Sequence, residues 1–450
     1  MNYPFWEVPY LGSQLMIAII AVIHVYISHF AIGGGFYLPI AEKYFSKQNN
    51  PGFMDYLKKH ARFFLIITGV FGALSGVGIW FTIGLTNPET TSSLIHTFVF
   101  AWAIEWVFFL VEIVSIIFYY YTFDFMSRRN HIIIGWIYLV SAWLSLFVIN
   151  GILTYMLTPG DWLTTKSIWD GFFNPTFFPS LFVRTFAMLM LITIFTIFTA
   201  TRIKEDDLRE KIVRFNTKWI IPVIIGMVIS LVWYYFMLPD DRQLLLTLGF
   251  SGIGPGNLSI LTRLVTIGFI TFILSILVIF FGPFLNPRNF RTSIAVLLLI
   301  MGFIIVGTFE FSRETLRKPF TIVDYIYSNS TRVNDKDKYL KEGLLKNIKW
   351  TDIKEITPEN KLKAGRQIFL NQCQACHTKE RYGYRSVVDL NLKAERNKEA
   401  IKNFVELIKS NDPNVNMYLR YMPQFLGNDK ETDALIEYIN SLVEKYNENK

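Results

Sequence analysis

Cysteine is nearly absent from this chain, with two residues among 450. A fold held together by several disulfides is therefore excluded, because such scaffolds need many more cysteines. Charged side chains are also scarce, at 18% of the residues, against about a quarter in soluble proteins. Hydrophobic residues make up 52%. This composition is typical of a membrane protein rather than of a soluble domain.

Lysine and arginine are missing from residues 1–12. A cleaved secretory signal begins with a basic segment, so we expect the first apolar run to be retained. The net charge of +8 raises nucleic acid as a partner class, but most basic residues lie in loops between apolar runs. That placement indicates membrane topology, and no nucleic-acid partner is expected.

Eight apolar runs are long enough to cross a bilayer, which takes about 20 helical residues. They lie near residues 13–40, 63–85, 94–123, 132–157, 180–201, 217–238, 258–283 and 292–311. Loops 41–62, 124–131, 202–218 and 284–291 hold fifteen Lys and Arg, and loops 86–93, 158–179 and 239–257 hold two. By the positive-inside rule the first set faces the cytoplasm, which places both termini outside.

The two cysteines share one motif, Cys373-Gln374-Ala375-Cys376-His377. At this spacing two thiols can add to the vinyl groups of one haem while the histidine binds its iron, so we expect a covalent haem c. Zinc would need two further ligands nearby, and a redox dithiol would leave His377 without a role. Met422, before a short amphipathic helix at 431–443, is the expected second axial ligand, with Met417 as its competitor.

Ionisable side chains inside apolar helices are costly and mark candidate functional sites. They are His24, His29, Glu105, Glu112 and Arg184. His24 is the favoured ligand of an embedded haem and His29 a second candidate, although either fits a hydrogen-bonded core histidine. Glu105 and Glu112 are seven residues apart and share a helix face. They fit a haem ligand, a proton-relay acid, paired carboxyls or a helix-packing contact.

Three further histidines, His60, His96 and His131, fall at the ends of expected helices. For these we favour solvated side chains at the membrane interface over a functional role.

Near residue 311 the composition changes from apolar runs to a charged, polar segment. The segment Lys361–Phe369, the haem motif and Met422-Pro423 before the last helix resemble a class I cytochrome c over about 358–445. We therefore expect a membrane domain at 1–311, a polar linker at 312–357 that tethers the cytochrome, and a cytochrome c domain at 358–450. In such proteins haem c is attached on the outer side of the bacterial membrane, which agrees with the expected topology.

Single positions in the apolar helices resemble subunit I of the cytochrome bd quinol oxidases, over about residues 10–240. They are Ser13-Gln14-Leu15, His24, Gly33, Gly72-Ala73-Leu74-Ser75-Gly76, Ala103-Ile104-Glu105, Phe108-Phe109-Leu110-Val111-Glu112, Leu144-Ser145-Leu146 and Asn150-Gly151 before Thr158-Pro159. The resemblance implies that His24 matches a haem-ligating histidine and that one or more haems b or d lie in the membrane domain. It also implies a second membrane subunit as partner.

Several departures accompany this resemblance. Glu105 and Glu112 are one residue closer together than the family's two glutamates. Arg184 lies where the family carries a haem-binding histidine; a guanidinium cannot ligate iron, so we expect it to pair with a haem propionate. Loop 239–257 lacks the long segment associated with quinol oxidation, and the membrane part ends one helix early.

These patterns predict an all-α protein: a bundle of about eight transmembrane helices, with both termini outside, and a small helical cytochrome c domain. We expect a respiratory haemoprotein of the bacterial inner membrane, surrounded by lipid, that takes electrons from a periplasmic electron-transfer protein through haem c to the embedded haems. Glu105 and Glu112 are the candidate catalytic carboxyls, and oxygen reduction is the implied activity. A non-catalytic conduit between the quinone pool and periplasmic cytochromes, and a structural anchor, stay open as alternatives.

Overall fold

The structure, a computed structural model, describes residues 3–251 and 257–447. The chain divides into two compact units. We call Val22–Val77 with Phe98–Leu316 the bundle unit, and Met1–Ala21 with Gly78–Thr97 and Arg317–Lys450 the C-terminal unit. Among the described residues, helices make up nearly all of the regular structure in both, in agreement with the predicted all-α class.

Eight helical segments of the described chain are long and apolar enough to cross a membrane, which confirms the predicted number. They are Gly12–Phe45, Gly52–Thr86, Val99–Tyr121, Arg128–Tyr155, Phe177–Ala200, Asp206–Phe236, Ile260–Phe284 and Thr292–Arg317. The third span starts later than predicted, because Phe98 leaves helical dihedral angles and separates two helices there.

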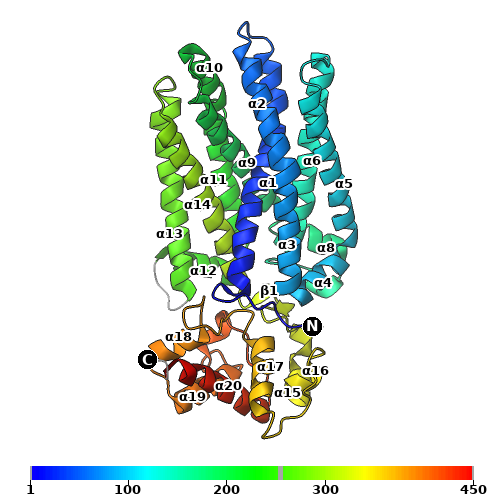
Figure 1. The fold of residues 1–450 in the computed structure, drawn as a ribbon, viewed down its shortest axis with the longest axis vertical. Coiled ribbons are helices and arrows are strands. Elements are labelled where there is room, and N and C mark those ends of the chain that lie inside the picture. The colour runs from blue at the N-terminus through cyan, green and yellow to red at the C-terminus, as the bar shows by residue number, and fades with distance from the viewer. Residues whose placement is uncertain (1–2, 252–256, 448–450) are drawn as a thin grey trace. The chain divides into compact units, whose positions relative to one another are not determined.

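The helices of the bundle unit run side by side, as the ribbon in Figure 1 shows. Its elements, some of which continue into the other unit, are α1 (Gly12–Phe45), α2 (Gly52–Ile66), η1 (Ile67–Gly72), α3 (Ala73–Thr86), α5 (Val99–Tyr121), α6 (Arg128–Tyr155), α7 (Trp162–Thr165), α8 (Ile168–Phe172), α9 (Phe177–Ala200), α10 (Asp206–Thr217), α11 (Ile220–Phe236), α12 (Asp240–Ser251), α13 (Asn257–Ile279), η2 (Phe280–Phe284) and α14 (Thr292–Arg317). The predicted short loop 239–257 is largely α12, and its residues 252–256 lie outside the described residues.

Helices α1, α5 and α6 pack closely through a glycine. A Cβ atom on Gly135 of α6 would lie 3.0 Å from the ring of Pro39 on α1 and 3.0 Å from the ring of Tyr119 on α5. Only a residue without a side chain allows this approach without displacing a neighbour. The contact brings the polar residues at this end of the three helices together.

The C-terminal unit contains shorter elements. They are α4 (Pro88–Thr97), β1 (Phe320–Ile322), β2 (Ile326–Tyr327), η3 (Val333–Asp335), α15 (Lys336–Glu342), α16 (Leu344–Asn347), α17 (Lys361–Gln372), α18 (Val387–Lys393), α19 (Lys398–Lys409), η4 (Met417–Arg420) and α20 (Asp429–Asn447). The two strands pair antiparallel, with Phe320 opposite Tyr327. Helix α20 contains the amphipathic helix predicted at 431–443.

Helices α17 and α20 cross at Gly365. A Cβ atom at this position would lie 2.0 Å from the carbonyl oxygen of Ala434, so any larger residue would push the two helices apart. One turn further along, the Phe369 and Tyr438 rings lie 5.6 Å apart between their centroids. The helix that leads into the cysteine motif is thereby held against the last helix of the chain.

The prediction that residues 328–357 form a polar tether is wrong. Leu344 and Leu345 are 1% exposed and belong to the same hydrophobic core as α17 and α20. Their backbone N–H groups donate to the carboxylate of Glu431, at 3.0 and 2.8 Å. Apolar side chains spaced within a polar segment pack into this core, so the segment is folded structure rather than free chain.

Candidate haem sites

The cysteine motif follows α17 in a helical turn. The backbone N–H groups of Cys376 and His377 both donate to the carbonyl of Cys373, at 3.1 and 3.0 Å. This turn places the two sulfurs and the imidazole on one side, as haem attachment requires. Both cysteines are free thiols. Burial, and then the neighbouring Cys376, raise the pKa of Cys373 to about 12, whereas a redox-active thiol has a lowered pKa, so the dithiol alternative is disfavoured.

The imidazole of His377 is oriented by the backbone. Its Nδ1 lies 2.8 Å from the carbonyl oxygen of Arg385, which can only accept, so Nδ1 carries the proton and Nε2 keeps its lone pair. Burial lowers the pKa of His377 and so favours the neutral ring that binds iron. Among the described residues no three His, Cys, Asp or Glu side chains converge into one cluster. The residues present therefore fit a haem.

The two candidate axial methionines differ in exposure. Met417 begins η4 and is 52% exposed. Met422 is partly buried, and its backbone N–H donates to the carbonyl of Tyr418 at 2.8 Å. A ligand that shields one face of a haem is better supplied by the less exposed thioether, which supports Met422. Its role as ligand stays a prediction.

The N-terminal segment belongs to the same unit as the motif, which the sequence did not predict. Gln14 Nε2 lies 3.1 Å from the sulfur of Cys376. Gln374 Nε2 donates to the carbonyl of Phe5 at 3.1 Å. Other contacts are the backbone hydrogen bond from Tyr384 to Tyr10 at 2.6 Å and the salt bridge between Lys379 and Glu7. The N-terminal residues thus hold the motif from a part of the chain more than 350 residues away.

In the bundle unit, His24 is oriented as a ligand would be. Its Nδ1 lies 2.9 Å from the hydroxyl of Ser75, which itself donates to the carbonyl of Phe71 at 2.6 Å. Because that hydroxyl proton is already used, Ser75 accepts from Nδ1, and Nε2 keeps its lone pair. No partner for Nε2 lies among the described residues. The neighbouring Gly76 leaves this side of the ring open, since a Cβ atom there would lie 3.4 Å from His24.

His29 and Arg184 lie near a buried acid. Arg184 is 4% exposed and its Nη2 lies 2.7 Å from Oε1 of Glu310 on α14. The other oxygen of Glu310 pairs with Arg313 at 3.0 Å. His29 is 3% exposed, lies within electrostatic range of this pair, and donates from Nδ1 to the carbonyl of Val25 at 2.6 Å. Arg184 Nε has no partner among the described residues, so its N–H can still donate to a haem propionate.

The two glutamates of α5 have different surroundings. Glu105 is partly buried and accepts a hydrogen bond from the hydroxyl of Ser145 on α6 at 2.9 Å. Glu112 is 5% exposed, and its carboxyl has no hydrogen-bond partner among the described residues. Its electrostatic neighbours are Glu105 and Tyr138. A buried carboxyl without a fixed partner is suited to take up and release a proton.

Two of the three histidines interpreted as solvated are buried instead. His131 is fully buried and His60 is 4% exposed; His60 Nε2 lies 2.8 Å from the hydroxyl of Thr199. Only His96 is exposed, as expected. The interpretation is wrong for His60 because α2 begins at Gly52, so this histidine lies within the helix and not at its end. It is wrong for His131 because contacts with α1 and α5 bury the first turn of α6.

Sequence reasoning also missed Glu42 and Glu310. Glu310 lies one residue before the expected end of the last membrane run at 311. Glu42 lies in the predicted loop after the first run, yet it is fully buried and bonded to three side chains. The signal for Glu310 was its place within helical reach of Arg313, a spacing that allows an ion pair.

Comparison with known proteins finds two families in this chain. The family described as cytochrome bd terminal oxidase subunit I matches residues 13–236, and the cytochrome c family matches residues 362–443. This chain joins a cytochrome bd subunit I domain to a cytochrome c domain. A solved structure, bd oxidase from Geobacillus thermodenitrificans, has a TM-score of 0.60 at 14% identity and covers 68% of this chain and 87% of its own. No curated protein sequence matches the chain.

A bd subunit I domain fused to a cytochrome c domain makes this chain a respiratory electron-transfer haemoprotein and a multi-pass membrane protein. The cytochrome c domain implies a covalent haem c, and the bd domain implies haem b or d. At 14% identity, the similarity to this solved structure supports the fold of the bd domain and says nothing of individual residue roles.

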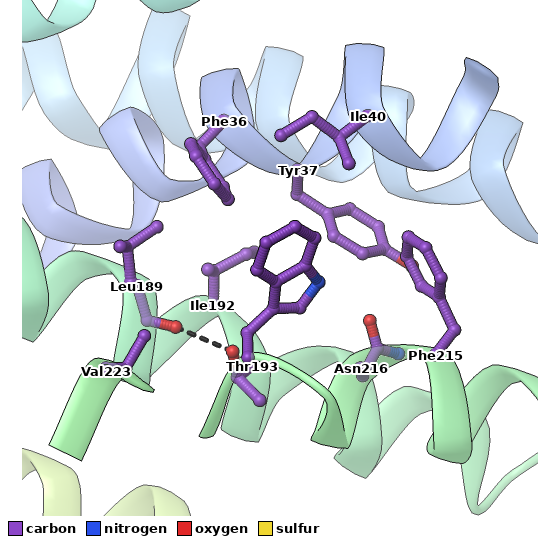
Figure 2. Close-up of a pocket in the computed structure, with 10 residues that line it drawn as sticks. Phe36, Tyr37, Ile40, Leu189, Ile192, Thr193, Phe215, Asn216 and Val223 are labelled. Carbon is purple, nitrogen blue, oxygen red and sulfur yellow. Dashed lines mark hydrogen bonds between the residues drawn. The ribbon is translucent and has the colours of Figure 1, made fainter. Parts of the chain in front are cut away.

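The bd domain also contains a small cavity, shown in Figure 2. Its volume is about 20 Å³, which is room for about one water molecule and not for a haem. Among its lining residues, Tyr37 and Asn216 contribute polar side chains. Thr193 in the same lining donates to the carbonyl of Leu189 at 2.7 Å. We assign no haem to this cavity.

Proposed function

We propose that this chain takes electrons through haem c and passes them to haem in the bd domain, where oxygen is reduced. The observation that carries the proposal is the presence of a paired arginine, Arg184, at this place in the bundle. It occupies the position at which the resemblance places a haem-binding histidine, and its guanidinium is ion-paired with Glu310 at 2.7 Å. Electrons that would otherwise reach the bd haems through that ligand need another path, and the added cytochrome c domain offers one.

The proposed roles of the chain's residues follow from their contacts. Cys373 and Cys376 anchor haem c, and His377 and Met422 bind its iron, with a thioether raising the reduction potential relative to a second histidine. His24, oriented by Ser75, would bind the iron of one haem in the bundle and Glu105 that of another, with His29 as a further candidate. A haem with an open iron position supplies the oxygen-binding chemistry. Arg184 Nε holds a propionate of that haem.

Oxygen reduction consumes protons, and the α5–α6 pair offers carboxyls to deliver them. Glu105 accepts from Ser145, and Glu112 lies near Tyr138, whose hydroxyl donates to the carbonyl of Ala31 at 2.6 Å. Glu112 gains and loses a proton without breaking a hydrogen bond to the described residues. We assign it the delivery of protons to the haem site.

The side of the membrane and the partners also belong to the proposal. The basic loops between the helices favour a cytoplasmic location for the ends of α1, α5 and α9, and an outer, periplasmic location for the cytochrome c domain of a bacterial inner-membrane protein. A periplasmic electron-transfer protein is then the electron donor. A second membrane subunit is the expected partner of the bd domain, within the lipid bilayer.

The test is a dithionite-reduced difference spectrum of the purified protein, with and without carbon monoxide, beside a pyridine haemochrome count. We expect haem b or d together with haem c, and a carbon monoxide shift of one bundle haem. Bundle haems that all fail to bind carbon monoxide would replace oxygen reduction by the conduit alternative. Haem c alone would overturn both and leave the bundle as an anchor.

A further inference from the structure

A second polar cluster, which the proposed chemistry does not use, lies at the opposite end of α5 from Glu105. Glu42 of α1 is fully buried and accepts three hydrogen bonds. The donors are the Tyr119 hydroxyl at 2.7 Å, Arg128 Nη1 at 2.6 Å and His131 Nδ1 at 2.8 Å. The side chain of Arg128 is 40% exposed, so one edge of this buried cluster reaches solvent.

The second nitrogen of His131 also faces an acceptor. Its Nε2 lies 2.7 Å from the backbone carbonyl of Tyr119. That carbonyl lies in the last turn of α5, which ends at Tyr121, and so lacks an intrahelical partner. A carboxylate and a carbonyl can only accept, so both ring nitrogens must carry protons for both bonds to form. The geometry therefore holds His131 as an imidazolium, and the C-terminal end of a helix favours that positive charge.

The titratable and charged groups bonded to His131 or to its carboxylate partner come from three elements. They are Glu42 from α1, Tyr119 from α5 and Arg128 from the first turn of α6, and the described structure contains no others. The ring of Phe123, 5.1 Å from that of His131 between centroids, covers it from the intervening turn. The imidazolium is thus paired with one carboxylate, which it shares with Arg128, and its ring is fully buried.

This cluster is in register with the proposed proton-delivering carboxyl. Tyr119 lies seven residues after Glu112 on α5, and buried Ser115 lies between them on the same face. On α6, Tyr138 follows His131 by seven residues and is the electrostatic neighbour of Glu112. Two helical turns, about 10 Å of rise, separate the two levels. Polar groups therefore recur on the facing sides of both helices.

We propose that His131 is the proton-loading group of this column. The imidazolium releases one proton, which ends on the carboxylate of Glu112, and the His131–Glu42 pair is refilled by one proton from solvent at the Arg128 edge. No electrons move in this step. The inference rests on the proposed function, because it assigns Glu112 as the receiver.

The test uses the full-length protein and the variants His131→Gln and Glu42→Gln, with exposed His96→Gln as the matched control. The first measurement is proton uptake from unbuffered solution after rapid chemical reduction, followed with a pH-indicating dye. We expect an uptake about tenfold slower in both cluster variants and unchanged in the control, while the haem spectra of all proteins stay the same. Oxygen consumption as a function of pH is the second measurement.

Uptake at the wild-type rate in both cluster variants, with intact haem spectra, would overturn the inference. If His131→Gln does not assemble, Tyr119→Phe is the replacement, since it removes one donor to Glu42 and keeps the backbone carbonyl. Wild-type protein that consumes no oxygen, but whose reduction-linked proton uptake is slowed in the cluster variants, would refute oxygen reduction and still support His131. The two failures are therefore distinguishable.

Discussion

The two units of this chain arrange apolar and polar side chains in opposite ways. In the bundle unit, Phe100 and Phe125 are 73% and 77% exposed, whereas Glu42 and Arg184 are 0% and 4% exposed. In the C-terminal unit, Phe369 lies in a core closed by apolar residues from several helices. The difference reflects the surroundings, because hydrocarbon accepts exposed phenylalanine and water does not.

This contrast determines where function can be recognised. In the bundle unit a buried ionisable group is expensive, so each one needs a partner or a task. Glu310 has partners, the guanidinium groups of Arg184 and Arg313, and Glu112 has none among the described residues. In the C-terminal unit, function is carried by a contiguous motif on an ordinary hydrophobic core. The following predictions test the contrast, from the largest expected effect to the smallest.

Replacing both motif cysteines, Cys373→Ala with Cys376→Ala, should abolish covalent haem completely, because no other thiols exist in the chain. Haem staining after denaturing electrophoresis measures this, with exposed Met417→Leu as the control that should keep its haem. Covalent haem in the double variant would contradict the assignment of the motif.

Replacing His24 with Ala should remove the b- or d-type absorbance of the bundle and leave haem c intact, since the ligand role depends on one Nε2 lone pair. Reduced difference spectra compare this variant with exposed His96→Ala. Bundle haem absorbance at the wild-type level would rule out His24 as a required ligand.

Glu310→Gln should destabilise the bundle unit by roughly 3–5 kcal/mol, because two buried guanidinium groups lose their carboxylate. The C-terminal unit has its own core, so its stability should change little. Thermal unfolding followed separately through bundle and haem c absorbance distinguishes the two. The control is Asp124→Asn, which breaks the exposed pair with Lys58 and should have little effect; equal losses in both variants would contradict the role of the buried pair.

Gly365→Ala should destabilise the C-terminal unit by about 1–3 kcal/mol, because the added methyl group collides with the carbonyl of Ala434. The bundle unit should be unaffected. Denaturant unfolding followed through haem c measures the change. Gly69→Ala is the control, since open space surrounds that position; a destabilisation of the two variants by the same amount would refute the close helix crossing.

Much of the architecture was predictable from local patterns. The eight spans and the two family resemblances were confirmed by the structure or by the family matches. The tether at 328–357 was not, because Leu344 and Leu345 bury themselves in a core whose other members lie up to about a hundred residues later. Scattered leucines in a polar segment do not reveal such distant partners.

His24, Glu105 and Glu112 were recognisable as candidates because hydrocarbon makes any ionisable residue within an apolar run conspicuous. His131 and Glu42 were not, since both lie in segments whose composition resembles an ordinary polar loop. Only the packing of α1, α5 and α6 around Gly135 brings them together and removes water from them.

The amino-acid sequence by itself determined the number of spans, the two families and the kind of haemoprotein, because hydrophobic length and motif spacing are local properties. The tertiary structure decided which ionisable groups are paired, which are left without a partner and which nitrogen of each histidine is available. Those properties depend on contacts between helices far apart in sequence, because a hydrogen bond forms only where the fold brings its donor and its acceptor close together.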